Sequence, residues 1–142
     1  MRNSRIICFV AVLMLASCSE QSTEKAASAS VTENETAASP VQAGRRAFSE
    51  CAVCHSARQG APHRVGPNLF DIVGQNAGTR DGFAYSSAMR NSGVIWSRET
   101  LDAYIDNPQA FIRGNRMSYT GQPDSEKRRA IIDYLESLSA PE

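Results

Sequence analysis

The motif Cys51-x-x-Cys54-His55 restricts the fold of this chain more than any other feature. Two thiols three positions apart lie on one side of a helical turn, where both can reach the vinyl groups of one porphyrin. The imidazole that follows can then point at the iron, and this spacing is the attachment signature of a c-type haem.

Two alternatives are a zinc site and a redox-active disulfide. A zinc site needs a second ligand pair, but no cysteine follows Cys54. A thioredoxin-like pair needs surrounding strands and helices in alternation, which the pattern does not predict. We therefore expect one covalently attached haem c.

The start of the chain has the features of an export signal. Arg2 and Arg5 precede an apolar run at residues 6–16, which is shorter than the roughly 20 residues that span a bilayer. The segment at residues 15–18, Leu-Ala-Ser-Cys, resembles the lipobox of bacterial lipoproteins, and this implies cleavage before Cys18 and its acylation. Several acyl chains, at ~0.8 kcal/mol per buried methylene, would make a stable membrane anchor. The alternative is ordinary signal cleavage nearby, which would release a soluble periplasmic protein.

Composition divides the chain into three parts. Residues 1–17 are the expected signal peptide. Residues 18–40 contain mainly Ser, Ala, Thr and Glu, which cannot bury enough apolar surface to fold, and predict a disordered tether after the lipidated cysteine. Residues 41–142 hold most of the aromatic and branched residues and form the expected haem domain, whose modest core a buried haem would enlarge. The formal charge of the whole chain is zero, which argues against a nucleic-acid partner.

The domain is expected to be all-helical with long loops. An amphipathic helix should start at Val41 and run into the haem motif, and Gly, Pro and Asn predict loops at residues 56–82. A helix that Ser97 caps should stop at Asn107, because Pro108 follows. Asp124 should cap the last helix. Short helical segments are expected at 85–90 and 108–112, a loop is expected at 114–123, and no alternating strand pattern is present.

A second axial ligand for the iron has two candidates in the domain, Met89 and Met117. Met89 falls in a predicted short helix, whereas Met117 lies in a glycine-flanked loop that can place a thioether over the open face of a porphyrin. A lone methionine usually fills a gap in a core. The loop and the haem motif favour Met117 as the ligand opposite His55.

The chain resembles the class I cytochromes c, the mitochondrial and bacterial electron carriers, from Val41 to Leu138. The motifs that carry the resemblance are Cys51-x-x-Cys54-His55, Gly66-Pro67-Asn68-Leu69, Gly82-Phe83-x-Tyr85, Trp96, the Met117 loop and the closing helix. The resemblance implies an all-α class I cytochrome c fold, in which one covalent haem c is wrapped by a small helical domain.

The resemblance also implies roles for individual side chains around the haem. The carbonyl of Pro67 should accept the Nδ1–H of His55, which would fix the imidazole ring. Tyr85 and Trp96 should donate to a buried haem propionate, and Tyr104 should lie beside the sulfur of the methionine ligand.

Other matches concern the scaffold. Gly44 and Phe48 should pack across the last helix near Tyr134 and Leu135. His63, which could be imagined as an alternative iron ligand, matches a structural loop histidine that bonds to the backbone.

The chain departs from the usual pattern at several positions. Gln75 replaces an arginine near a propionate, and losing that charge should lower the reduction potential somewhat. The other departures, none of which removes an iron ligand, are Met89, Arg113, Asn115, Arg116 and Tyr119.

These features predict a monomeric one-electron carrier rather than an enzyme. It would shuttle between a quinol-oxidising complex, such as a quinol–cytochrome c oxidoreductase, and a terminal acceptor such as an oxidase. It would be lipid-anchored on the periplasmic side of a bacterial membrane. The alternatives are a permanent haem subunit of a respiratory complex and, with less support, a haem enzyme or sensor with an open sixth site.

Arginines dominate the basic residues of the domain. From Gln42 onward, Lys127 and eleven arginines stand against eleven acids. Six of these arginines are expected to rim the haem edge and to steer an acidic partner, the alternative being an ordinary solvated surface. They are Arg45, Arg46, Arg58, Arg64, Arg113 and Arg116.

Overall fold

The structure is a computed structural model that describes residues 39–138. The expected export signal, the lipidation site Cys18 and all but the end of the expected tether lie outside the described residues. Among the described helices, none is both long and apolar enough to cross a bilayer.

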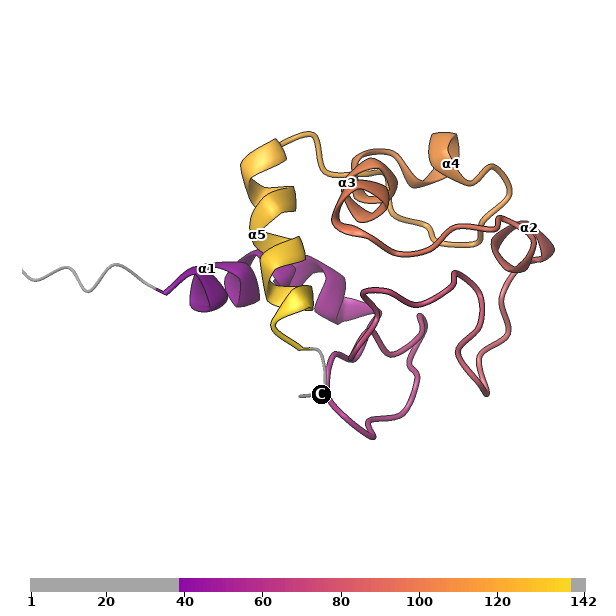
Figure 1. Ribbon diagram of the computed structural model, residues 1–142, viewed down its shortest axis with the longest axis horizontal. Coiled ribbons are helices and arrows are strands. Elements are labelled where there is room, and N and C mark those ends of the chain that lie inside the picture. Colours follow the sequence, from indigo (N-terminus) through magenta and orange to yellow (C-terminus); the bar gives the residue numbers. More distant parts are fainter. Residues whose placement is uncertain (1–38, 139–142) are drawn as a thin grey trace, which may run out of the picture. The chain divides into compact units, whose positions relative to one another are not determined.

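The described chain is helical, and long loops connect its helices (Figure 1). Its elements are α1 (Pro40–Ala47), the 3₁₀ helix η1 (Phe48–Val53), α2 (Ser87–Arg90), α3 (Arg98–Asp106), α4 (Pro108–Phe111) and α5 (Ser125–Glu136). Within residues 39–138 the only β pairing is an isolated bridge between Asn76 and Ile95. The predicted all-α class is therefore confirmed.

Local capping chemistry fixes most helix ends. Ser97 forms a capping box with Thr100 at the start of α3, and the helix ends at Asp106, one residue before Asn107 and Pro108. The Asp124 side chain accepts from the backbone N–H groups of Glu126 and Lys127 at the start of α5. Both predicted caps are present.

The structure differs from the expectation at two helix boundaries. The helix expected to run unbroken from Val41 into the haem motif becomes a 3₁₀ helix after Ala47. Tighter turns of this kind are frequent where an α-helix ends. The short helix expected from Tyr85 begins at Ser87, because the Ser86 hydroxyl caps it by accepting from the N–H of Met89 at 3.1 Å.

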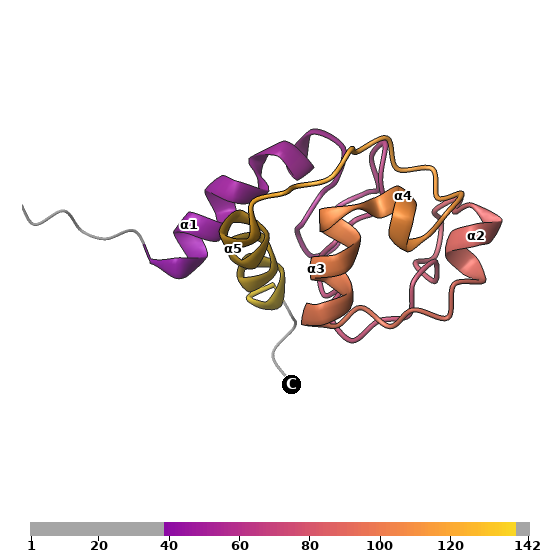
Figure 2. The same cartoon turned by 90° about the horizontal axis from the view of Figure 1, so that it is seen from above.

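Helix α1 crosses α5 at close range (Figure 2). The approach depends on Gly44, since a Cβ there would lie 2.7 Å from Cβ of Tyr134 and still closer to the carbonyl oxygen of Ala130. One turn later, the rings of Phe48 and Tyr134 pack with their centroids 5.2 Å apart. The predicted packing of the first helix against the last is confirmed.

Helix α5 also anchors α3. Ile131, Ile132 and Leu135 of α5 are each at most 2% exposed. Arg98 at the start of α3 binds Asp133 at 2.6 Å and also Glu136, so charged contacts flank the apolar interface. Helices α3 and α5 contribute side chains to the wall of the cavity described below, and α1 packs against α5.

Candidate functional site

A cavity of about 520 Å³ lies inside the helical core. Native interiors contain few voids larger than a water molecule, and cavities of roughly 300–1,000 Å³ are typical of small-molecule and cofactor sites. Most of its wall is apolar, and the sulfur-containing and imidazole side chains on it are Cys51, Cys54, His55, Met89 and Met117. The cavity therefore brings together both predicted thiols and both predicted axial ligands.

The two thiols stand at the end of η1. Cys51 and Cys54 are half-buried and are not joined by a disulfide. Burial, helped by the negative charge of Glu50, raises the pKa of the Cys51 thiol to about 11, so this thiol is protonated at neutral pH. Between residues 39 and 138, no cluster of three or more His, Cys, Asp or Glu side chains could hold a metal ion by itself. The described residues thus give no support to the zinc alternative.

The imidazole of His55 is fixed in one tautomer. Its Nδ1 lies 2.7 Å from the carbonyl oxygen of Pro67, and because a carbonyl only accepts, Nδ1 carries the hydrogen. Burial lowers the pKa of His55, and the bond to Pro67 opposes this only in part. The ring is therefore neutral and its Nε2 keeps a lone pair for a metal. The contact that the resemblance implies between Pro67 and His55 is present.

Polar contacts hold the Met117 loop. The buried Asn115 side chain donates to the carbonyls of Pro108 (2.7 Å) and Ile112 (2.8 Å) and accepts from the N–H of Met117 (2.9 Å). The Tyr104 hydroxyl lies 3.8 Å from the Met117 sulfur, as the resemblance implies. Sequence reasoning noted Asn115 only as a departure and missed its role; a buried amide next to a candidate ligand was the available signal.

Met89 and Met117 both line the cavity, so this position alone does not decide which of them is the better candidate for the second axial ligand. Met89 is 8% exposed on α2, whereas Met117 is only partly buried in its loop. The contact from the Tyr104 hydroxyl goes to the sulfur of Met117.

Aromatic side chains form part of the cavity wall. Tyr85 and Trp96, the expected propionate donors, both line it, and the Trp96 ring packs against Tyr104 with centroids 5.0 Å apart. The carbonyl of Tyr85 accepts from Arg116 at 2.8 Å and also from Arg90, which ties this segment to the Met117 loop.

His63 is occupied at both ring nitrogens. Its Nδ1 accepts the backbone N–H of Asn68 at 3.0 Å, and its Nε2 donates to the carbonyl of Asp81 at 2.8 Å. A ring that bridges two backbone segments in this way has no lone pair left for a metal. The structural role predicted for His63 is confirmed.

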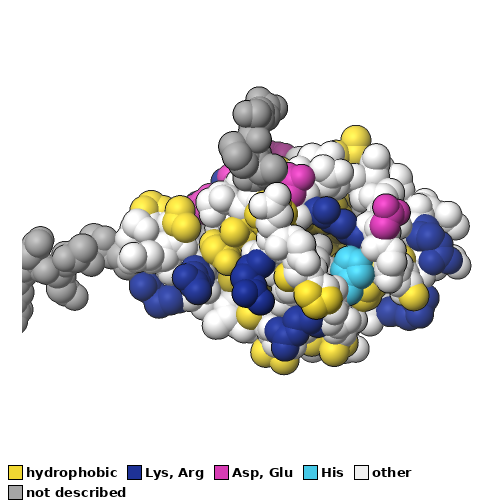
Figure 3. Space-filling view, turned by 90° about the horizontal axis from the view of Figure 1, so that it is seen from below, with side chains coloured by type: hydrophobic (Ala, Val, Ile, Leu, Met, Phe, Trp, Pro, Cys, Tyr) yellow, Lys and Arg dark blue, Asp and Glu magenta, His cyan; other side chains and the backbone are white. Residues whose placement is uncertain are grey.

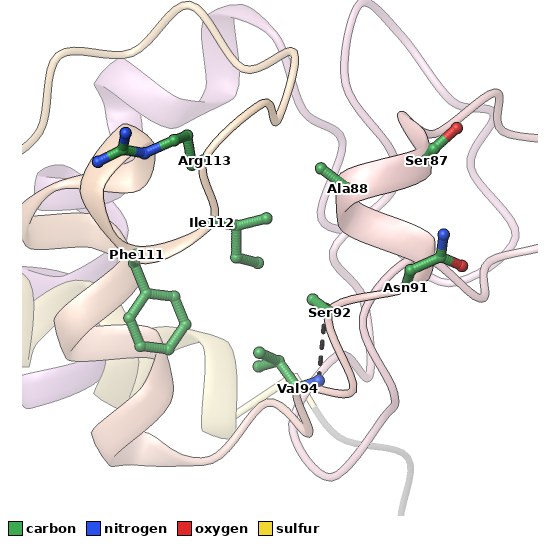
Figure 4. Close-up of a pocket in the computed structure, with 8 residues that line it drawn as sticks. All are labelled: Ser87, Ala88, Asn91, Ser92, Val94, Phe111, Ile112 and Arg113. Atoms are coloured by element: carbon green, nitrogen blue, oxygen red, sulfur yellow. Dashed lines mark hydrogen bonds between the residues drawn. The ribbon is translucent and has the colours of Figure 1, made fainter.

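The arginines expected at the haem edge do not all lie there. Arg116 lines the cavity, and Arg64 donates to the carbonyl of Ala52 within the haem motif. Arg113 instead lines a separate hollow of about 390 Å³ between α2 and the end of α4, where Phe111 and Ile112 lie opposite Ala88 (Figure 4). No thiol, imidazole or thioether lines that hollow, so it offers no axial ligand for a haem iron.

The residues around the large cavity fit a haem c. Two unpaired thiols offer the attachment points, a neutral imidazole and a thioether offer the axial ligands, and apolar side chains from η1, α3 and α5 form the pocket. A Cβ at Gly66 would lie 2.7 Å from Nδ1 of His55, so the backbone at this position is shaped around the imidazole.

Comparison with known proteins agrees with this geometry. A family model described as cytochrome c matches residues 41–139. Cytochrome c2 of Blastochloris viridis is 40% identical over 104 residues, which is 73% of this chain and 82% of that protein. Cytochrome c of Trypanosoma brucei brucei is 46% identical over 83 residues, 58% of this chain and 89% of that protein.

A cytochrome c homolog of Bradyrhizobium diazoefficiens is 42% identical over 100 residues, which cover 70% of this chain but only 54% of that longer protein. The family model alone covers more than half of the present chain. The chain therefore belongs to the cytochrome c family, whose members are electron-transfer proteins that carry a covalently attached haem c.

Proposed function

We propose that this protein is a one-electron carrier in which Cys51 and Cys54 hold the haem and His55 and Met117 ligate its iron. One observation carries the proposal: an imidazole and a thioether that line the same apolar cavity are each held by a contact of their own, to Pro67 and from Tyr104. When bound, the haem iron supplies a one-electron couple, and His/Met ligation favours a high potential.

The chain's own residues limit the chemistry to electron transfer. A neutral His55 with Nδ1–H bonded to Pro67 is a strong and fixed donor. A haem iron held by both His55 and Met117 would have no open position for oxygen or peroxide. The apolar wall contributed by residues such as Leu101 and Ile131 excludes water and keeps the surroundings similar in both redox states.

The rim of the cavity offers a surface for a redox partner. Val53 and Val65 line the cavity, yet they are 68% and 81% exposed. The exposed Arg58 and Arg64 lie in the same segment of the chain, and Figure 3 shows Lys and Arg side chains gathered on one face among apolar ones. Apolar centres with charged rims are common at protein interfaces, and the positive charges would steer an acidic partner.

The partners and the location rest on the sequence. We infer that the protein shuttles between a quinol-oxidising complex and a terminal acceptor such as an oxidase, on the periplasmic side of a bacterial membrane. An acylated Cys18 and a tether over residues 18–40 would keep the domain near both membrane-bound partners and raise its effective concentration. Covalent attachment of haem to two thiols takes place outside the cytoplasm, which agrees with the export signal.

The ligation is tested with Met117→Ala and the matched variant Met89→Leu, which keeps the volume of the other methionine. Met117→Ala should lose the long-wavelength band of Met-ligated ferric haem and should bind cyanide (ferric) or carbon monoxide (ferrous) rapidly. Met89→Leu should keep the band. Rapid ligand binding by the unmodified protein, or loss of the band only in Met89→Leu, would contradict the proposal.

The anchor and the carrier role need separate measurements. Mass spectrometry of the mature protein should show one added haem, acyl chains on Cys18 and the loss of residues 1–17. Electron transfer to an acidic partner should slow as ionic strength rises, and Arg64→Glu should slow it more than Arg129→Glu on α5. A rate that does not change with salt contradicts steering, and co-purification with an oxidase through detergent and salt would indicate a permanent subunit.

A further inference from the structure

A partly buried cation near the cavity, Arg80, has no counter-ion among the described residues. One terminal nitrogen of the Arg80 guanidinium donates to the backbone carbonyls of Phe70 and of Asp71, the latter at 2.6 Å. The Nε of Arg80 is buried and has no hydrogen-bond partner within residues 39–138, and no carboxylate there forms an ion pair with this side chain. Buried N–H groups normally have a hydrogen-bond partner, so this Nε calls for an acceptor, and a carboxylate would also match the charge of the guanidinium.

The position of Arg80 indicates where that anion would lie. The two carbonyls that hold its guanidinium stand between Leu69 and Ile72, which both line the large cavity. Tyr85 lines the same cavity. Burial raises the pKa of the Tyr85 hydroxyl, and the positive charge and the backbone N–H of Arg80 act in the opposite direction. Arg80 does not line the cavity itself, but it is held by the backbone between two residues that do.

The other charges near this end do not replace Arg80. Gln75, where the resembling cytochromes have an arginine, is exposed and neutral. Arg90 and Arg116 are exposed, and both donate to the carbonyl of Tyr85. The neighbouring acids are Asp71, which is half-buried, and Asp81, which is exposed.

We propose that Arg80 is the counter-ion of a haem propionate at the Tyr85–Trp96 end of the cavity and replaces the charge that is missing at Gln75. This inference rests on the proposed haem site. Arg80 acts as a positioning residue: its charge keeps the carboxylate ionised and at the same time cancels its effect on the iron. The expectation that Gln75 lowers the potential is then offset by Arg80.

Removing the charge has a predictable sign. Without Arg80, the carboxylate should titrate at higher pH, because its ionised form loses a nearby positive charge. Above the pH at which the carboxylate titrates, its unbalanced negative charge stabilises ferric iron and lowers the reduction potential. Below that pH the carboxyl group is neutral and has no such effect. The potential of Arg80→Gln should therefore match the wild type near pH 5 and fall below it by pH 8, with a severalfold rise in the ferric-to-ferrous ratio at a fixed electrode potential.

The experiment is a spectroelectrochemical titration of the holoprotein between pH 5 and pH 9. Arg80→Lys keeps the charge and should keep the flat wild-type profile, as should Arg90→Gln, which removes an exposed arginine near Tyr85. Gln75→Arg should restore the flat profile when it is added to Arg80→Gln. The wild-type spectrum, recorded first, shows separately whether haem is attached and whether a methionine ligates its iron, so failure of the haem site is recognised before the profiles are compared.

Two results would overturn the inference. One is an Arg80→Gln protein that is less stable but has the wild-type pH profile, which would make Arg80 only a brace for the carbonyls of Phe70 and Asp71. The other is failure of both Arg80→Gln and the double variant with Gln75→Arg to fold, since a charge at position 75 should rescue a lost counter-ion but not a lost brace.

Discussion

Replacing Gly66 by alanine tests how closely the backbone is fitted to the axial imidazole. A Cβ at this position would lie 2.7 Å from Nδ1 and 2.8 Å from Nε2 of His55, whereas ordinary contacts begin at 3.4 Å. The ring would have to move by at least 0.7 Å, the difference between 2.7 Å and 3.4 Å, because its Cε1 atom would lie closer still to the added Cβ. A shift of that size along the 2.7 Å bond to Pro67 takes it beyond the normal range of about 2.7–3.2 Å.

The size of the effect follows from three contributions. Overpacking a fitted site costs about 1–3 kcal/mol, and a weakened buried hydrogen bond costs about 0.5–1.5 kcal/mol. Gly66 does not have a left-handed backbone, so alanine should also restrict the unfolded chain and return about 0.4–1 kcal/mol. The net loss is about 2 kcal/mol, which lowers Tm by about 4–8 °C per kcal/mol in a domain of this size.

The assay combines thermal unfolding with the ferric absorption spectrum, and Gly60→Ala is the control. Gly60 has φ of +67° and nothing within 4 Å of an added Cβ, so alanine there costs about 1–2 kcal/mol of backbone strain and leaves the iron untouched. Only Gly66→Ala should change the spectrum and shift the reduction potential. A Gly66→Ala protein with wild-type Tm and spectrum would refute the reasoning.

Two further predictions concern the scaffold. Gly44→Ala should lower the free energy of unfolding by about 1–3 kcal/mol although alanine favours a helix, because its Cβ would meet α5; chemical denaturation measures this, and Arg46→Ala on the exposed side of α1 should change it by less than about 0.5 kcal/mol. Burial alone would raise the pKa of Glu50. The hydrogen bond and the charge of Lys127 lower it by more than that, so the pKa lies below its ordinary value of 4.5. The pair, 2.9 Å apart and partly exposed, therefore stabilises the fold by at most about 1 kcal/mol above pH 4.5, and this is lost as the pH falls below 4.5. The free energies of unfolding of Glu50→Gln and the wild type should become equal at low pH. A difference that stays the same at every pH contradicts a stabilising charge pair between Glu50 and Lys127.

Features fixed by short-range chemistry could be predicted from the sequence. Ser97, Asp124 and Pro108 set helix ends through groups two or three residues away, and each boundary was predicted within one residue or so. The 3₁₀ helix after Ala47 could not be predicted, because six residues are too few to distinguish a period of 3.0 from 3.6. The motif residues of the candidate site reached one cavity as expected.

Long-range polar contacts could not be predicted in this way. Arg80 bonds to carbonyls ten and nine positions earlier, and nothing in its neighbouring sequence indicates burial. Arg113 was expected at the haem edge only because it lies near Met117 in the sequence, yet the chain turns after α4 and carries its side chain to another surface. Both cases depend on the path of loops, which residue patterns describe poorly.

The way Asn115 braces its loop has a consequence for partial opening of the molecule. Helix α5 is fixed by buried apolar side chains such as Ile131, Ile132 and Leu135, whereas the Met117 segment is held by a few hydrogen bonds around one amide. Regions with few apolar contacts open at a lower free energy than the core. Amide protons of this segment should therefore exchange with solvent long before those of α5, and the sulfur ligand should be able to come away while both terminal helices stay folded.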